Sequence, residues 1–323
     1  MLKWLVGLDL GLIGSRIIGR PPKIDIAIIT IKQEEFNAVI NRFPGGRNFS
    51  VGGRWYYSVR VTATNGVMYR VAVGRCTEQG NAESHALTAQ ILEHVRPAFL
   101  LIVGIGGGIP ADEYTLGDVI VSTYLYDLQV DALSATAGTT HAAHGTKMAI
   151  PAASLAGHLP AMARELGLWF SEEAVTKPRP PVVLDDDSLY YGDDEWKVRV
   201  KRSLDANFGP DADRVAPIVT DGPILSSNHL VKDAAPLSEW LKFARDAKAI
   251  DMELAGVCTA MNNDSGRPVP FLAIRGLSDV VGYRRAPAWT AYACETAASF
   301  ALALIRSGAI ARSGDHTAFR WGS

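Results

Sequence analysis

Three short segments carry the residue types best suited to chemistry. They are the glycine run Gly104–Gly108, the triplet Asp251-Met252-Glu253, and the stretch Arg275-Gly276-Leu277-Ser278-Asp279. Each follows an apolar run typical of a buried strand. If the ends of these strands converge on one crevice, they bring together two carboxylic acids, an arginine and exposed backbone N–H groups. Such a set suits cleavage of a nucleoside's glycosidic bond.

Asp279 is the candidate general acid. It follows Ser278 at the exit of an apolar strand, where burial raises the pKa of a carboxyl group toward neutrality. The alternative is a structural role, as a helix cap or in an ion pair with Arg275 or Arg284.

Two further carboxylates also have structural alternatives. Glu253 has the chemistry to accept hydrogen bonds from two vicinal sugar hydroxyls, but it also fits the start of a helix, where the macrodipole favours an acid. Glu34 and Glu35 fit the first turn of a helix in the same way.

The glycine run allows positive φ angles and close approach of the backbone to a ligand. It is neither a P-loop nor a dinucleotide fingerprint, because no GK[ST] follows it and Pro110 interrupts any immediate helix. Glycines at a tight strand exit are also commonly structural.

Composition excludes some partners. The chain has 323 residues, 20% of them charged, and a net charge of −2, which gives no electrostatic reason to expect nucleic acid or an anionic membrane. Cys76, Cys258 and Cys294 lack CxxC spacing. They are expected to be buried thiols in a reducing, cytoplasmic compartment rather than disulfide partners or zinc ligands.

Short apolar runs alternate with amphipathic helices from Ile24 onward, which predicts an α/β sheet covered on both faces. Strands are expected at Ile26–Ile29, Arg54–Val61, Met68–Val73, Phe99–Val103, Asp118–Ser122, Ala216–Val219, Ala249–Met252 and Pro270–Ile274. Helices are expected at Glu34–Arg42, Asn81–His94, Ala152–Leu166, Trp196–Phe208, Leu254–Met261 and Trp289–Ile305.

The predicted domain, residues 23–312, is flanked by an N-terminal extension, 1–22, and a C-terminal tail, 313–323. The extension is too short and too glycine-rich to span a membrane, so packing on the body or on a neighbouring subunit is favoured over membrane contact. Residues 135–215 form a divergent insertion. Its acidic clusters, Asp185–Asp187 and Asp193–Glu195, are expected on a solvated surface rather than around a metal.

Four segments, in this order, resemble the purine nucleoside phosphorylase and uridine phosphorylase superfamily, closest to the methylthioadenosine/S-adenosylhomocysteine nucleosidases. They are Ile26–Phe36, Leu101–Ser122 with its glycine turn and "xGDVVVS"-like stretch, Ile250–Glu253, which resembles the family's "VEME", and Ile274–Asp279, which resembles its "VRAISD". The resemblance spans residues 24 to 310, apart from much of 135–215. It implies a three-layer αβα sandwich with a twisted, mixed central β-sheet.

The resemblance also implies roles for individual residues. Asp279 would protonate purine N7 so that the base leaves neutral, Glu253 would hold the ribose hydroxyls, and Met252 would pack against the sugar. Ile224 and Leu225 occupy the place where the family contacts the base, with Tyr124 or Tyr126 as alternative stacking partners. The binding set is completed by Gly106, Gly107 and Ser278.

The nucleophile is expected to be water. Phosphorylases of this type place arginines where this chain has Ile102 and Thr30–Gln33, and an apolar side chain cannot hold a phosphate dianion. Glu35 matches the carboxylate that orients and deprotonates water, and Arg275 matches its supporting arginine. Phosphate binding through Lys32 or Arg75 remains an alternative.

A departure from the nucleosidase pattern lies in the glycine turn, where Ile105 replaces the family's serine. The turn Gly-Ile-Gly-Gly-Gly-Ile-Pro also resembles nucleosidase-like modules of signalling and defence proteins. The expected function is a cytoplasmic, homo-oligomeric purine nucleoside or nucleotide N-ribohydrolase that releases adenine, with no metal or organic cofactor. A phosphorylase and a nucleotide-binding sensor are the alternatives.

Overall fold

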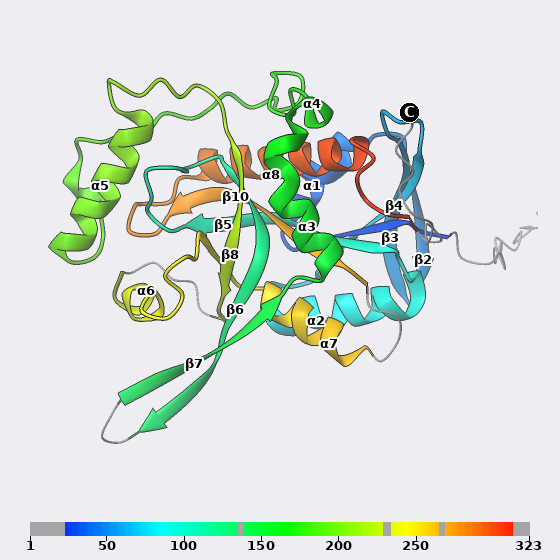
Figure 1. Ribbon diagram of the computed structural model, residues 1–323, viewed down its shortest axis with the longest axis horizontal. Coiled ribbons are helices and arrows are strands. Elements are labelled where there is room, and N and C mark those ends of the chain that lie inside the picture. The colour runs from blue at the N-terminus through cyan, green and yellow to red at the C-terminus, as the bar shows by residue number, and fades with distance from the viewer. Residues whose placement is uncertain (1–22, 135–137, 229–233, 265–268, 313–323) are drawn as a thin grey trace, which may run out of the picture.

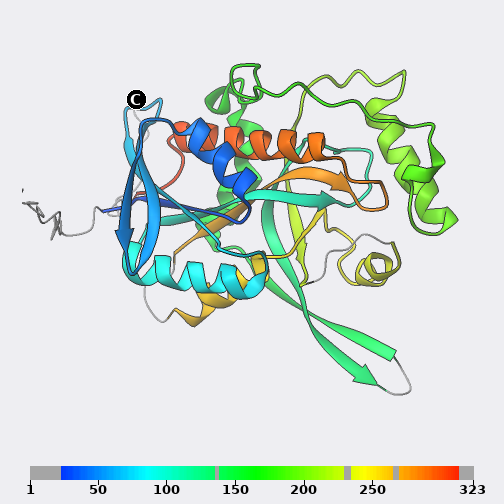
Figure 2. The same ribbon diagram turned by 180° about the vertical axis from the view of Figure 1, so that it is seen from behind.

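The computed structural model describes residues 23–134, 138–228, 234–264 and 269–312 (Figures 1 and 2). The predicted extension and tail lie outside these ranges. The strands are β1 (Ile26–Thr30), β2 (Arg47–Val51), β3 (Arg54–Thr62), β4 (Met68–Arg75), β5 (Phe99–Gly108), β6 (Val119–Ser134), β7 (Gly138–Lys147), β8 (Val219–Ser226), β9 (Ala249–Asp251) and β10 (Phe271–Val280). The α-helices are α1 (Gln33–Arg42), α2 (Asn81–Gln90), α3 (Ile150–His158), α4 (Ala163–Leu166), α5 (Asp194–Phe208), α6 (Ala234–Trp240), α7 (Leu254–Asn263) and α8 (Pro287–Arg306).

All the described strands belong to one mixed sheet. Its open part runs β2-β3-β4-β1-β5, antiparallel through β2, β3 and β4 and parallel from β4 to β5. Beyond β5 the sheet closes on itself, because β5 pairs with both β10 and β9, while β6 and β8 complete a ring β5-β10-β6-β8-β9. The ring holds the ends of β5, β9 and β10 together.

Helices cover both faces of the sheet. α1 and α8 pack together on one face, and α2 and α7 pack together on the other, in both views (Figures 1 and 2). Every residue of β1 is buried, as expected of a strand covered on both sides. The predicted three-layer α/β sandwich with a mixed central sheet is therefore confirmed.

α8 is the one helix in the described part of the chain that is long and apolar enough to cross a membrane. However, 72% of its most apolar window is buried inside the protein. It packs against α1, β5 and β10, which is the environment of a core helix.

Two segments expected as turns or loops lie inside strands, so that prediction was wrong. The glycine run forms the second half of β5, and none of its glycines has a left-handed φ. Arg275–Asp279 belongs to β10, with a bulge between Leu277 and Asp279. The physical reason is close packing: a Cβ at Gly104 would lie 2.6 Å from Arg275 Nη1, so glycine is needed here for space and not for chain reversal.

Much of the 135–215 segment is also regular structure. β7 pairs with β6 in a hairpin that projects from the body (Figures 1 and 2). α5 buries Trp196, Val200 and Leu204.

The acidic clusters of this segment are exposed, as predicted. Two of their carboxylates cap helices, since Asp186 accepts a hydrogen bond from the Ser188 N–H and Asp193 accepts one from the Trp196 N–H.

Candidate functional site

A cavity of about 230 Å³ lies where β5, β9 and β10 meet the connection between β1 and α1. Its wall includes most of the residues that the sequence singled out: Glu35, Gly106, Gly107, Met252, Glu253, Ser278 and Asp279. Arg275 is not in the wall. It lies fully buried and contacts Asp251, which is part of the cavity wall.

Glu35 is buried at the start of α1 and is held entirely by backbone amides. One carboxylate oxygen, Oε2, accepts hydrogen bonds from the N–H groups of Ile31 and Lys32, both at 2.8 Å. The other, Oε1, accepts one from the Ile105 N–H at 3.0 Å. Ile105 thus contacts Glu35 through its main chain, whereas a serine at that position would add a hydroxyl. The three amides fix the carboxylate in one orientation toward the cavity.

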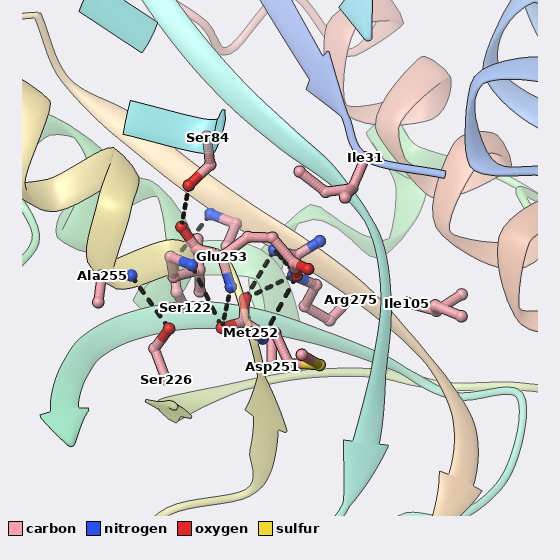
Figure 3. Close-up of polar contacts among 12 residues, drawn as sticks. Ile31, Ser84, Ile105, Ser122, Ser226, Asp251, Met252, Glu253, Ala255 and Arg275 are labelled. Atoms are coloured by element: carbon pink, nitrogen blue, oxygen red, sulfur yellow. Dashed lines mark hydrogen bonds and ion pairs between the residues drawn. The ribbon is translucent and has the colours of Figure 1, made fainter. Parts of the chain in front are cut away.

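A buried ion pair joins Arg275 to Asp251 (Figure 3). Nε and Nη2 of Arg275 donate to Asp251 Oδ2 at 3.1 and 2.6 Å. Burial alone would lower the pKa of Arg275, but the charges of Asp251, Glu253 and Glu35 outweigh it and raise the pKa. Arg275 Nη1 has no hydrogen-bond partner among the described residues. Arg275 was expected to support Glu35, but its direct partner is Asp251.

The start of α7 is fixed by side chains from three elements, and this fixes Glu253. Asp251 Oδ1 accepts from the N–H groups of Glu253 and Leu254, both at 3.3 Å. The next amide, of Ala255, donates to Ser226 Oγ at 3.0 Å (Figure 3). The amide after it, of Gly256, donates to Asn81 Oδ1 at 2.7 Å. The first N–H groups of a helix have no partner within the helix, so these bonds satisfy groups that would otherwise be buried and unpaired. Ser84 Oγ also donates to the Glu253 carbonyl at 2.7 Å.

The carboxyl of Glu253 faces the cavity and is only 9% exposed. Burial first, and then the charge of Asp251, raise the pKa of Glu253 to about 7, against an opposing effect of Arg275. Near neutral pH this group is therefore present in both protonation states. It has the capacity to accept from one sugar hydroxyl and donate to another.

This pKa predicts how stability depends on pH. Between its unfolded and folded pKa values, a carboxyl whose pKa is raised on folding binds more protons in the folded state than in the unfolded state. The contribution of Glu253 to the free energy of unfolding is therefore fully present below about pH 4.5 and is lost as pH rises through about 7. We expect Glu253→Gln to lose less stability than the wild type over that interval. Urea midpoints measured at either end of it check this, and equal pH dependence in the two proteins would contradict it.

Asp279 lies at the end of β10 with its side chain 21% exposed. Ser278 Oγ donates to its Oδ1 at 2.6 Å, and Arg285 Nε lies 3.7 Å from the same oxygen. Burial raises the pKa of Asp279, and the Ser278 hydrogen bond and the charges of Arg285 and Lys32 only partly oppose it. The neighbouring cation is Arg285, not Arg275 or Arg284.

Two predicted base contacts do not reach the cavity. Ile224 and Leu225 are fully buried in β8, where they pair with Ala249 and Ile250. A ligand cannot touch them without rearrangement of the core. Tyr124 and Tyr126 pack edge to face at 4.7 Å between ring centroids and are also outside the cavity wall.

The structure adds residues that sequence reasoning gave no firm role. The cavity wall contains Lys32, Gln79 and Arg285. Arg75, the other candidate phosphate ligand, is exposed and absent from that wall. Lys32 precedes Glu35 at the start of the same helix, so its position in the sequence already indicated that it would lie close to Glu35. Gln79 and Arg285 lie in connecting segments whose path no local pattern predicts. No cluster of three or more potential metal ligands occurs among the residues that the structure describes.

Gly104 is a position where one added methyl group should disturb the site directly. A Cβ there would lie 2.6 Å from both Arg275 Nη1 and Glu35 Oε1, closer than van der Waals contact allows. We expect Gly104→Ala to displace one or both groups and to reduce catalytic rate by about 10²-fold, the effect of a misplacement near 1 Å. Initial rates of base release measure this.

Gly157→Ala is the matched control, because a Cβ at that helical position would have no described atom within 4 Å apart from its chain neighbours and the adjacent backbone of its own helix. It should be as active as the wild type. A Gly104→Ala enzyme with wild-type rates would show that neither group needs its present position.

Comparison with known proteins gives the family. Residues 25–306 match the family profile described as the phosphorylase superfamily. The chain is 27% identical over 230 residues to a death domain-containing ATP nucleosidase from Amphimedon queenslandica, covering 70% of this chain and 37% of that protein. It is 23% identical over 227 residues to ATP nucleosidase Cap17 from Escherichia coli (strain KTE188), covering 70% and 39%. The chain thus spans less than half the length of these curated relatives.

Solved structures show the same fold at low identity. A 5′-methylthioadenosine/S-adenosylhomocysteine nucleosidase from Neisseria meningitidis, in complex with methylthio-immucillin-A, superposes with a TM-score of 0.58 at 16% identity, covering 88% of this chain and 99% of that one. The corresponding enzyme from Colwellia psychrerythraea 34H, in complex with adenine, gives 0.57 at 15% identity, covering 89% and 96%. With the family match extending over nearly the whole described domain, the chain belongs to the phosphorylase superfamily.

Proposed function

We propose that this protein is a purine N-ribohydrolase that releases adenine from an adenine nucleoside or nucleotide. The observation that supports this most is that Asp279 and Glu35, far apart in sequence, line the same cavity with Glu253. A carboxyl with a raised pKa, a second carboxylate held by amides and a third suited to sugar hydroxyls match the three tasks of glycosidic cleavage.

In the proposed reaction, the bond between the anomeric carbon and the purine nitrogen breaks and its electron pair goes to the base. Asp279 delivers a proton to purine N7, so the base leaves neutral. A water oxygen bonds to the anomeric carbon, and its proton passes to Glu35. Glu253 holds the ribose hydroxyls and Met252 packs against the sugar. The products are free purine and a reducing sugar.

Water is favoured over phosphate as the nucleophile. Ile102, at a position where phosphorylases carry an arginine, is fully buried in β5. An unpaired phosphate dianion beside such a side chain would cost several kcal/mol or more. Lys32 lies in the cavity wall, and this observation keeps phosphorolysis as the second candidate.

The substrate we favour is an adenine nucleotide such as ATP. The two curated relatives are named ATP nucleosidases. Lys32 and Arg285 place two cations in the cavity wall, which suits a substrate with an anionic 5′ group better than one with a thioether.

Product analysis tests the proposal. The purified full chain is incubated with ATP, adenosine and methylthioadenosine, with and without inorganic phosphate, and the products are separated by chromatography. We expect free adenine and a reducing sugar, formed fastest from ATP and independently of phosphate. Ribose-1-phosphate formed only with phosphate would establish the phosphorylase instead, and binding without base release would establish a nucleotide sensor.

We also propose a cytoplasmic location, supported by three buried free cysteines, and a homo-oligomer without a nucleic-acid partner. A neighbouring subunit would complete the site near residues 126–133. The β6–β7 hairpin supports this, since it projects from the body of its own subunit, where a neighbouring subunit could contact it (Figure 1). The boundaries proposed for the catalytic unit remain 23–312.

A further inference from the structure

A groove with three arginines lies on the antiparallel part of the sheet, away from the cavity described above. It has a volume of about 670 Å³, and its wall contains Arg47 of β2, Arg60 of β3 and Arg70 of β4. All three side chains are exposed, and no acidic residue belongs to the described wall. The groove shares no residue with the cavity around Asp279.

Strand register places the three arginines on one face. Arg60 is directly opposite Arg70 in the β3–β4 pair. Arg47 is opposite Ser58, which is two residues from Arg60 and therefore on the same side of β3. Like charges directly opposite each other on neighbouring strands destabilise a sheet. The arrangement is unfavourable unless something neutralises it.

Nothing in the described part of the chain supplies that neutralisation. No ion pair or side-chain hydrogen bond joins Arg47, Arg60 or Arg70 to another described residue. Asp25 lies close by, but its carboxylate accepts from the backbone N–H of Arg70 at 2.9 Å and not from the guanidinium. An anion from outside the chain would find all three guanidinium groups available.

Protection of a sheet edge does not explain the cluster. Charged residues on an edge strand discourage pairing with another molecule, and this accounts for Arg47 on the terminal strand β2. Arg60 and Arg70 lie on β3 and β4, which are paired on both sides. The repulsive pair is thus placed where edge protection is not needed.

We propose that this groove binds an oligophosphate, meaning a chain of linked phosphate groups, either free or as part of a nucleotide. From β2 to β4 the guanidinium groups are spread over two interstrand spacings, about 10 Å, which is wider than one phosphate group. Guanidinium groups bind phosphate oxygens through paired, charge-assisted hydrogen bonds. The site is separate from the proposed catalytic cavity, and its existence does not depend on the reaction proposed there.

Direct binding tests the proposal. Full-length protein is titrated with inorganic tripolyphosphate, with ATP and with a single-stranded oligonucleotide at low ionic strength, by calorimetry. We expect tripolyphosphate to bind, more weakly as salt is added. ATP is also the proposed substrate of the catalytic cavity, so only the part of ATP binding that is lost in Arg60→Glu is assigned to the groove. Equal loss for ATP and tripolyphosphate means that only the phosphates are recognised, and greater loss for ATP means that the groove also contacts the nucleoside; both support the proposal.

Arg60→Glu is the informative variant. It should weaken tripolyphosphate binding by roughly tenfold or more, because a carboxylate replaces one of three guanidinium groups. It should not lower the melting temperature, because the introduced carboxylate would face Arg70 as an opposite charge. An unchanged melting temperature shows that weaker binding comes from loss of the site and not from loss of the fold. Arg164→Glu makes the same charge change at a side chain that is 95% exposed and far from the groove in sequence, and should bind as the wild type does.

Two results would overturn the proposal. One is no tripolyphosphate or ATP binding by the wild type, or binding that Arg60→Glu leaves unchanged. The other is binding of the oligonucleotide alone, lost in Arg60→Glu, which would assign the groove to nucleic acid. Adenine release, measured on the same samples, reports on the proposed function independently.

Discussion

Asp279→Asn is expected to reduce the rate of purine release by about 10²–10⁴-fold, the usual contribution of a positioned general acid. The amide is nearly the same shape as the acid, but it cannot deliver a proton to the leaving base. Substrate affinity should change less than the rate, because the amide keeps the shape of the acid and can still donate a hydrogen bond to the base. Single-turnover rates and equilibrium binding, measured together, separate the two effects.

The wild-type rate should also fall as pH rises above the raised pKa of Asp279, because ionisation removes the proton that the base requires. Asp187→Asn is the control: that carboxylate is 84% exposed and should be replaceable without loss of rate. If Asp279→Asn released adenine at the wild-type rate, another group would have to be the acid.

Arg275→Leu is expected to destabilise the fold by about 3–5 kcal/mol, the cost of leaving a buried charge without its partner. Arg275 and Asp251 have side chains with no exposed surface, so neither water nor another cation replaces the lost pair. The measurement is urea denaturation followed by circular dichroism. Arg202→Leu is the control, since its pair with Asp112 is exposed and should contribute less than about 1 kcal/mol.

A double variant tests the cause. When Asp251→Asn is combined with Arg275→Leu, no buried charge of the pair remains, and the introduced amide still has an oxygen to accept from the first N–H groups of α7. The double variant should recover part of the stability that Arg275→Leu loses. A single variant no less stable than Arg202→Leu would mean that the buried pair does not hold the site together.

The layer architecture was predictable because it depends on local patterns. β1 and the first half of β5 are continuous apolar runs, and α1, α7 and α8 begin and end within three residues of their predicted limits. The convergence of Glu35, Glu253 and Asp279 was predicted from strand order and family resemblance, and all three line one cavity. Their catalytic roles remain predictions.

What local patterns missed depends on contacts between distant segments. A glycine run after an apolar strand suggests a turn, and only the packing of Arg275 against Gly104 explains why it continues as a strand. The partner of Arg275 depends on the pairing of β9 with β5, which brings Asp251 close to it from a distant part of the chain. Ile224 and Leu225 were expected at the base, but both side chains are buried in the hydrophobic core.

The closed ring of β5, β10, β6, β8 and β9 restricts how a small molecule can enter and leave. Each strand in it is bonded on two sides, so the floor of the cavity cannot part as two lobes of a hinged protein do. Entry and exit must therefore take place past side chains carried on connecting segments, such as Gln79 and Arg285. Release of product should accordingly depend on the mobility of those connections, while the strands stay in place throughout turnover.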